Sequence, residues 1–503
     1  MPLRARLNAL KPLHLAAVCA VALFVLIPWL TFEWHPELGE RVVGASSRLL
    51  GKRPPPETKN PFEPGWYDWR TRSQFQPVRQ DVSNMTVDDI CRAFPHHLLQ
   101  DIQPVLKTGH GVLETRVHDQ LESVSACLDD LLIFSDIDEI YQGREVIDVI
   151  GDLRSGFIEK TAQLADYLAQ KDLADNGTLA AGNPAQIKGW ALDKFKFLPQ
   201  ISRAWRMRPE KRWYVFFEAD TYIVWDNLFR LLANFDPDKP LYFGSPSPGV
   251  EGSWMANGGP GYVLSRETVR RLVKHDFDED GAYAGSKLSE RWEDQILHDC
   301  CGDSVVGWAV HEDAETILSG LWPMFNPHPL HGIPFSKLYW CQPVISLHKT
   351  LPAAQSDLWR WEEHRRQADR PLLYADLAEY LNLTETETRA DWDNADFDGY
   401  PAPHETDAHD SFEACGAACK SDDHCFQWTY HLQKCTFVRS FRLGRAKEEG
   451  VGLSKDPEVL KKNWNKEDQR FMAGWDVEAI RKWMEEHVCE RAQWVRPSLK
   501  RIF

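Results

Sequence analysis

One short stretch, Trp213–Val224, constrains the fold of this chain more than any other. Its first five residues are aromatic or β-branched, which is typical of a strand buried on both faces of a sheet. Two carboxylates, Glu218 and Asp220, then follow one residue apart. Because burying an unpaired charge is costly, two carboxylates at the mouth of a core strand predict a bound divalent cation, at the sheet edge where α/β proteins hold their ligands. The alternative is a strand that simply ends in solvent.

The N-terminus predicts a membrane anchor. Three basic residues lie within the first eleven positions, and an uncharged apolar run extends over 15–32. A cleaved signal peptide is the alternative, but no small-x-small cleavage site follows the run. We therefore expect a cytosolic tail at 1–14, a transmembrane signal anchor at 15–32 and a Pro-rich stem at 33–95, with the remainder lumenal.

The cysteines and the charge agree with a lumenal chain. Cys19 lies in the anchor, and the other ten cysteines form an even set that can pair completely in an oxidising compartment. Three Asn-x-Thr triplets fit glycosylation on the same route. The formal net charge of −17 argues against nucleic-acid binding.

A strand–helix–strand pattern precedes the acidic stretch. Apolar runs at 104–109 and 131–134 flank a helical pattern at 112–128, which predicts a βαβ unit and a parallel sheet. No G-x-G-x-x-G follows the first strand, so dinucleotide binding is disfavoured. The turn after this strand brings Lys107, Thr108 and Gly109 within reach of a nucleotide, and Lys194, on a predicted helix, is a further candidate for a pyrophosphate. A plain turn and a solvated lysine are the alternatives.

A Gly-rich segment, 251–265, follows the acidic stretch. Gly258, Gly259 and Gly261 have no side chains to pack, so the backbone can pass close to a ligand. Trp254 and Tyr262 can stack on that ligand. The alternative is an ordinary strand–turn–strand.

The rest of the chain adds an acidic pair, a histidine and a cysteine-dense module. Glu293 and Asp294 open a predicted helix, and an apolar strand at 339–348 ends in His348. Adjacent Cys300 and Cys301 are expected to pair with distant partners, Cys341 being one. Residues 391–398 are acidic but lack the EF-hand spacing, so we expect a linker. The cysteine spacing at 415–435 excludes common zinc patterns and predicts disulfides.

Taken in order, these motifs resemble glycosyltransferase family 31, the fringe and core 1 β1,3-galactosyltransferase superfamily. The acidic stretch stands where that family has Asp-Asp-Asp-Thr-Tyr, and the Gly-rich segment resembles its Gly-Gly-Ala-Gly-Tyr-Val-Leu-Ser. The later acidic pair and the strand-terminal histidine complete the set over residues 100 to 350. The cysteine-dense module resembles a PAN/apple domain, a fusion found in fungal relatives.

The resemblance implies a fold, a domain layout and a location. The fold is α/β, a GT-A-type nucleotide-sugar-binding domain with a mostly parallel central sheet. The layout is a GT-A domain at 96–352, a linker or helical extension at 353–408, a PAN/apple-like module at 409–445 and a charged helical tail at 446–503. The implied protein is a single-pass type II enzyme of the Golgi membrane, with its catalytic domain in the lumen.

The resemblance also implies roles for single residues. Asp220 and His348 would ligate Mn²⁺, which suits carboxylate and imidazole donors. Glu218 replaces the first Asp of the family motif and would contact the ribose or the metal. Asp294, or else Glu293, would be the catalytic base that deprotonates the acceptor. The acceptor and sugar pocket would be shaped by Trp254, Met255, Gly258, Gly259, Gly261 and Tyr262.

The function implied is an inverting β1,3-glycosyltransferase that moves a sugar, expected to be galactose, from a UDP-sugar to a glycan or glycoprotein. Two other readings stay open. One is a catalytically degenerate protein that binds carbohydrate or protein, with Glu218 and Ala219 as signs of decay. The other is a secreted disulfide-rich adhesin.

Overall fold

The computed structural model describes residues 69, 71–78, 82–180, 189–209, 211–404, 406–447 and 469–501. The predicted tail, the predicted anchor and the first part of the predicted stem lie outside these ranges. Within them, no helix is both long enough and apolar enough to span a bilayer. The stem prediction includes residues that are ordered here, because Val82–Asn84 forms a 3₁₀ turn and Val87–Cys91 forms helix α3.

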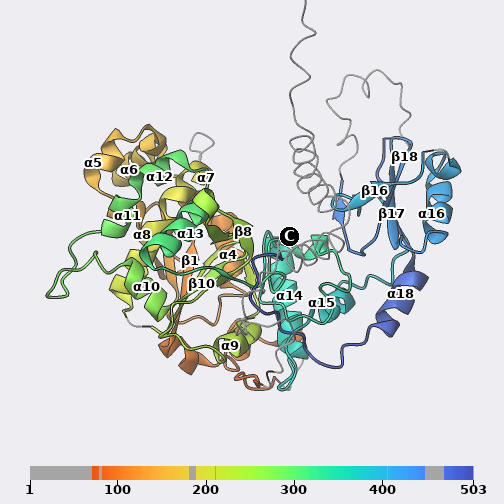
Figure 1. Cartoon of the computed structure of the whole chain (residues 1–503), viewed down its shortest axis with the longest axis horizontal. Coiled ribbons are helices and arrows are strands. Elements are labelled where there is room, and N and C mark those ends of the chain that lie inside the picture. Colours follow the sequence, from red (N-terminus) through yellow and green to blue (C-terminus); the bar gives the residue numbers. More distant parts are fainter. Residues whose placement is uncertain are drawn as a thin grey trace, which may run out of the picture. The chain divides into compact units, whose positions relative to one another are not determined.

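The core is an eight-stranded sheet with the order β11-β7-β10-β5-β1-β2-β4-β3 (Figure 1). All neighbouring strands run parallel except where β10 or β3 takes part. The strands are β1 Ile102–Lys107, β2 Leu132–Ser135, β3 Glu139–Tyr141, β4 Arg144–Asp148, β5 Trp213–Glu218, β7 Tyr242–Gly244, β10 Tyr262–Ser265 and β11 Ser319–Gly320. The predicted α/β class with a mostly parallel sheet is confirmed.

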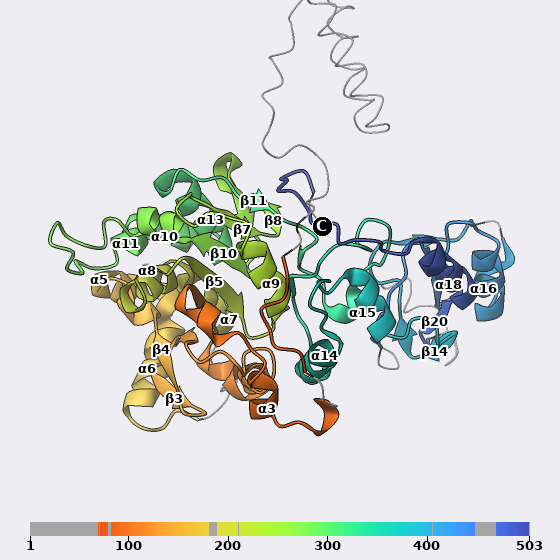
Figure 2. The ribbon, with the colours of Figure 1, turned by 90° about the horizontal axis from the view of Figure 1, so that it is seen from below.

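Alternation along β5 produces two hydrophobic cores, one on each face of the sheet. The ribbon shows the helices that pack around the sheet (Figures 1 and 2). Trp213, Val215 and Phe217 belong to one core, and Tyr214 and Phe216 belong to the other. The first core is covered by α3, α4 His118–Leu121, α9 Trp225–Leu232, α14 Pro352–Arg365 and α15 Tyr374–Tyr380. The second is covered by α5 Ser155–Lys160, α6 Ala165–Asp175, α7 Gly189–Leu192, α8 Phe197–Met207, α10 Arg266–Leu272, α11 Lys287–Arg291, α12 Glu293–His298 and α13 Gly302–Asp313.

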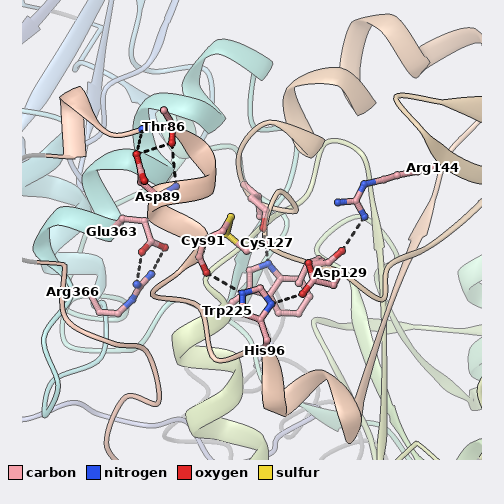
Figure 3. The surroundings of a disulfide bond; sticks show 12 residues. Thr86, Asp89, Cys91, His96, Cys127, Asp129, Arg144, Trp225, Glu363 and Arg366 are labelled. Atoms are coloured by element: carbon pink, nitrogen blue, oxygen red, sulfur yellow. Dashed lines mark hydrogen bonds and ion pairs between the residues drawn. A yellow bond between two sulfur atoms is a disulfide. The ribbon is translucent and has the colours of Figure 1, made fainter.

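The helix predicted at 112–128 is shorter and irregular. A π-helical turn covers Leu113–Val117, α4 follows, and turns complete the segment. A disulfide joins Cys91 of α3 to Cys127 at the end of this segment (Figure 3). Beside it, the indole Nε1–H of Trp225 donates to the carbonyl oxygen of Val124 at 2.8 Å. These two links fix the segment against α3 and α9.

A small three-stranded sheet adjoins the main sheet, and His348 directly follows one of its strands. Its strands are β12 Phe325–Asn326, β13 Ser346–Leu347 and β6 Tyr222–Ile223. The long strand predicted at 339–348 is therefore reduced to two residues, but it still ends directly before His348.

A second sheet, of five strands, forms the C-terminal part of the chain. Its order is β14-β20-β17-β18-β16, with β14 Thr388–Ala390, β16 Gly399–Pro401, β17 Gln427–His431, β18 Lys434–Val438 and β20 Met472–Trp475. Helices α16 Phe412–Lys420 and α18 Val477–Glu486 accompany it, and a separate ladder pairs β15 Trp392–Asp393 with β19 Arg445–Ala446. The sheet thus takes strands from both sides of 409–445. The acidic stretch expected to be a linker lies between β14 and β16 and contributes β15 to the separate ladder.

The disulfides confirm one cysteine prediction and correct another. All ten cysteines other than Cys19 are paired. The expectation of distant partners for Cys300 and Cys301 is wrong, because these two residues bond to each other. Cys341 instead bonds to Cys489, since the C-terminal segment returns to the main core, where Trp494 is buried. The two remaining bonds, Cys415–Cys435 and Cys419–Cys425, hold α16 on the second sheet.

Candidate functional site

The carboxyl ends of three neighbouring parallel strands meet at one edge of the main sheet. Lys107 ends β1, Glu218 ends β5 opposite it in register, and Asp136 directly follows β2. A cavity of about 370 Å³ opens at this edge. Its position is the one where open α/β sheets bind ligands.

Five of the predicted nucleotide or metal contacts line this cavity: Lys107, Thr108, Gly109, Glu218 and Asp220. The other side chains that line it include four charged groups outside the predicted contacts, namely Arg116, Asp136, Asp193 and Lys196, together with Gln170 and Trp190. The wall therefore combines cations and carboxylates with one exposed indole.

Lys107 is a buried cation held between two carboxylates. Its Nζ pairs with the Asp193 carboxylate and lies 3.1 Å from Oε1 of Glu218. Burial opposes the charge of Lys107, but the two carboxylates outweigh burial and raise the lysine pKa above its usual value. Burial, opposed by Lys107 and helped by Asp193 and Asp220, raises the pKa of Glu218 to about 7. The end of β1 thus places the charged ammonium group of Lys107 at the cavity wall.

Glu218, Asp220 and His348 come together although the histidine is far away in the sequence. One donor atom from each lies within 4.8 Å of the others. Nε2 of His348 is 3.6 Å from Oδ1 of Asp220, and that oxygen is buried with no hydrogen-bond partner in the described part of the chain. Burial lowers the pKa of His348 to about 4, although Asp220 opposes this shift, so the imidazole is neutral at physiological pH and free to act as a ligand. This donor set fits Mn²⁺.

Arg116 occupies the other side of Asp220. Its Nη1 donates to Oδ2 of Asp220 at 2.9 Å, from a side chain that is 48% exposed. It belongs to the π-helical turn at 113–117, a type of irregularity that is frequent at functional sites. A half-exposed cation beside a candidate metal ligand suits the binding of an anionic ligand.

The Gly-rich loop supports this cluster from behind and does not line the cavity. A Cβ on Gly259 would overlap the imidazole of His348. The carbonyl oxygen of Gly259 accepts a hydrogen bond from Oγ1 of Thr221 at 2.6 Å, and the N–H of Gly258 donates to Oδ2 of Asp303 at 2.8 Å. Gly261 has φ +78°, where other residues are strained. The glycines therefore allow close approach to a ligand-holding side chain.

The aromatic residues of this loop do not lie where the sequence suggested. Tyr262 is buried in the core, where its ring stacks on Phe216, so it is not available to a ligand. The reason is that Tyr262 begins β10 and pairs with β5. Trp254 and Met255 are half-buried in β9 Trp254–Ala256, and Met255 packs against Gly307 of α13. Neither of these two residues lines the cavity.

The two carboxylates at the start of α12, Glu293 and Asp294, have different surroundings. Glu293 accepts hydrogen bonds from Nε and Nη2 of Arg154. Asp294 is 81% exposed, and Nδ1 of His298 lies 3.4 Å from its Oδ1. Neither carboxylate lines the cavity.

Lys194, the predicted pyrophosphate contact, does not line the cavity, and Lys196 lines it instead. Nζ of Lys194 donates to the carbonyl oxygens of Leu297 and Asp299, at the end of α12. Lys196 is buried, pairs with Asp136 at 2.7 Å and donates to the carbonyl oxygen of Thr108. A 3₁₀ turn at Asp193–Phe195 separates α7 from α8 and decides which lysine faces the site. Asp136 is a site residue outside the predicted contacts, and its position directly after β2 is the sequence signal that could have identified it.

Sequence comparisons find relatives among glycosyltransferases. The chain is 42% identical over 66 residues to glycoprotein-N-acetylgalactosamine 3-beta-galactosyltransferase 1 of Xenopus laevis, which covers 13% of this chain and 18% of the relative. It is 36% identical over 73 residues to human chondroitin sulfate synthase 3, covering 12% of this chain and 8% of the relative. It is 31% identical over 120 residues to human beta-1,3-glucosyltransferase, covering 23% of each chain.

The chain therefore spans less than a quarter of the length of each of these curated relatives. The family model described as Fringe-like matches residues 192–317. This segment runs from the end of α7 through β5, Glu218, Asp220 and the Gly-rich loop to the residues that follow α13. The comparisons thus identify a Fringe-like segment at 192–317, and it contains the central strand and two of the three clustered donors.

Proposed function

We propose that this chain is a glycosyltransferase that moves a sugar from a UDP-sugar to a hydroxyl of a glycan or glycoprotein, with inversion and in β1,3 linkage. The observation that carries the proposal is the convergence of Glu218, Asp220 and His348 at the carboxyl edge of the sheet, beside a cavity whose wall holds the cations Lys107, Arg116 and Lys196 among carboxylates. The names of the relatives and the Fringe-like match support the same class. Galactose is the donor sugar that the first of these relatives suggests.

The metal ligands and the cations at this cavity suit the binding of a nucleotide diphosphate. Asp220 and His348 would hold the divalent cation, with Glu218 beside it. A bound Mn²⁺ would offset the negative charge that builds up on the departing UDP. Lys107 and Lys196 place two buried ammonium groups at the cavity wall, and Arg116 can leave Asp220 to contact a phosphate. The exposed Trp190 at the cavity offers a flat apolar surface.

For the base we propose Asp294. Its carboxylate is solvated and lacks a strong cationic partner, so it can accept the proton of the acceptor hydroxyl. Glu293 is bound on both oxygens by Arg154, which makes it the poorer candidate. Asp294→Asn should then keep UDP affinity and lose turnover, whereas Glu293→Gln should keep both.

The decisive experiment measures UDP release by the purified chain with a panel of UDP-sugars, with Mn²⁺ and with a chelator. Transfer should need the metal, and Asp220→Ala and His348→Ala should each abolish it while the folded state persists by circular dichroism. Normal turnover in either variant would refute the metal assignment. Calorimetry with UDP and Mn²⁺ separates the alternative, because a degenerate binding protein would show no UDP affinity with or without metal.

The anchor at 15–32 and the Golgi membrane location stay predictions from the sequence. Carbonate extraction of membranes from cells that express the full chain tests the anchor, because the protein should stay in the membrane fraction. Protease treatment of intact vesicles tests the lumenal orientation, because the C-terminus should be protected. Co-fractionation with Golgi membranes tests the location.

A further inference from the structure

A second cavity, of about 340 Å³, lies between the segment that follows β11 and the second sheet. One side is formed by residues of 322–339, and the other by residues next to β16 and β18, including Phe397 and Asp398. Its volume is at the small end of the roughly 300–1,000 Å³ typical of ligand pockets. Nothing in the proposed transferase chemistry uses this cavity.

Aromatic rings form much of its wall. Phe397 is 45% exposed and meets the ring of His328 edge to face, with 4.8 Å between centroids. On the side formed by 322–339, Trp322 and Tyr339 form a second edge-to-face pair at 5.5 Å. Burial lowers the pKa of His328 to about 4, so its ring is uncharged at neutral pH. The cavity therefore presents uncharged ring surfaces to a small ligand.

Polar groups lie between these rings. Asp398 accepts a hydrogen bond from Oγ of Ser440 at 2.9 Å and pairs with the buried guanidinium of Arg442. Arg439 also lines the cavity, with its guanidinium 4.3 Å from the ring centre of Tyr400. The indole of Trp322 is only 5% exposed, and its Nε1–H has no hydrogen-bond partner within the ranges that the structure describes.

We propose that this cavity binds a sugar unit of a saccharide. A pyranose ring has apolar C–H faces that pack on aromatic rings and a rim of hydroxyls that both donate and accept hydrogen bonds. Phe397 supplies the first surface. Asp398 and Arg439 supply partners for the second. A cation is a poor fit, because Asp398 is the single carboxylate of the lining and is already bonded to Arg442 and Ser440.

A peptide is a less suitable occupant. The edge strand next to the cavity, β16, has three residues and ends in Pro401, and short edges with proline resist pairing with an added strand. A peptide would then depend on the cavity alone.

The site is linked to the transfer cluster through the backbone. Strands β12 and β13 are parallel neighbours, and the N–H of His348 donates to the carbonyl oxygen of His328 at 3.3 Å. A saccharide held against His328 would therefore lie next to the strand pair that positions His348. Binding itself does not depend on transferase activity.

Saturation-transfer NMR on the full chain, without donor and without metal, tests the proposal. The probes are the methyl glycosides of galactose, N-acetylgalactosamine, glucose, N-acetylglucosamine, mannose and glucuronic acid. At least one should receive saturation. Phe397→Ala should weaken its affinity about five- to tenfold, as expected for loss of one ring contact. Phe397→Tyr, which keeps the ring, and Ile317→Ala, which removes an exposed apolar side chain elsewhere, should leave the affinity within about twofold.

Two variants separate this site from the transfer site. Asp220→Ala should leave the glycoside signal unchanged, whereas Arg439→Ala should reduce it. No signal from any probe, or a signal that Phe397→Ala leaves intact, would overturn the proposal. So would a signal lost in Asp220→Ala alone, since that places the sugar at the sheet edge. If short Ala/Ser/Thr peptides give a Phe397-dependent signal and the glycosides give none, the cavity binds peptide and the proposal is wrong.

Discussion

Gly259 lies against the imidazole ring of His348 so closely that any side chain at position 259 would occupy the space of the ring. The two residues are on different motifs, one in the Gly-rich loop and one after β13. The loop carries no ligand group of its own. Its contribution is to fix the position of the histidine, as groups around a metal site commonly do.

Gly259→Ala should therefore displace His348 and weaken Mn²⁺ binding. We expect a loss of about ten- to a hundredfold in metal affinity, in the range seen when the support of a ligand is removed. Isothermal calorimetry with Mn²⁺ measures it. Gly156→Ala is the matched control, because a Cβ on Gly156 meets no atom within 4 Å. Equal metal affinity in the two variants would show that His348 does not ligate.

Arg116 and Lys194 should differ in their effect on nucleotide binding. Arg116 lines the cavity beside Asp220, whereas Lys194 holds the end of α12 through backbone carbonyls. Arg116→Ala should weaken UDP binding in the presence of Mn²⁺ by about tenfold, the loss of one charge-assisted contact. Lys194→Ala should leave the affinity for UDP unchanged. Fluorescence or calorimetric titration measures both affinities. If Lys194→Ala weakens UDP binding and Arg116→Ala does not, then Lys194 contacts the nucleotide and Arg116 does not.

Glu362 should make stability fall as the pH rises. Its carboxylate accepts a hydrogen bond from Tyr222 at 2.6 Å. Burial raises the pKa of Glu362 from 4.5 to about 7, with Glu363 acting in the same direction and Arg366 and Tyr222 against it. Between these two values the folded state binds more protons than the unfolded state, so stability is lost as the pH rises through this window.

Glu362→Gln should remove most of that dependence. At about pH 8 the variant should be more stable than the parent by roughly 1–3 kcal/mol, and at about pH 5 the two should be similar. Urea unfolding at several pH values measures the difference. Glu363→Gln is the control: it breaks the ion pair with Arg366 and should lower stability at every pH. A pH-independent difference for Glu362→Gln would contradict the assignment.

The disulfides Cys341–Cys489 and Cys300–Cys301 should contribute very differently to stability. The first closes a loop of 148 residues, and the second joins neighbours. In the chain-entropy account, stabilisation grows with loop length. Cys341→Ser with Cys489→Ser should therefore lower the free energy of unfolding by about 2–5 kcal/mol. Cys300→Ser with Cys301→Ser should change it little. Peptide mapping without reduction checks the pairing first, and similar losses in both double variants would reject the explanation.

Much of the central sheet could be predicted because its strands are buried on both faces. The apolar runs around Val105, Ile133 and Phe216 predict buried parallel strands. The polar residues after these runs indicate the edge of the sheet where a ligand would bind. Asp220 fits the same rule, since it lies two residues after the end of β5, and His348, whose role the resemblance implies, comes directly after β13. The structure brings their side chains together although the sequence says nothing of their distance.

The remaining site residues depend on local geometry that periodicity does not contain. Arg116 lies on a π-helical turn inside a segment whose pattern predicts a regular helix. Lys194 and Lys196 differ only by the 3₁₀ turn between two helices. Tyr262 is a different case: it begins β10, which is buried at every position, so its ring packs in the core although it stands next to glycines. Disulfide connectivity does not follow from spacing, and Cys300–Cys301 shows this.

The assembly of the second sheet limits where this chain can be shortened. Strand β20 pairs with β17 and β14, while Trp475, Trp494 and Cys489 bind the same C-terminal segment to the main core. A protein ended after residue 445 would expose the backbone of β17 as a bare edge, leave Cys341 with an unpaired thiol and open the main core. Such an edge recruits other chains. Expression of the chain without residues 446–503 should therefore give aggregates, and the C-terminal segment belongs in any preparation used to test the proposed activity.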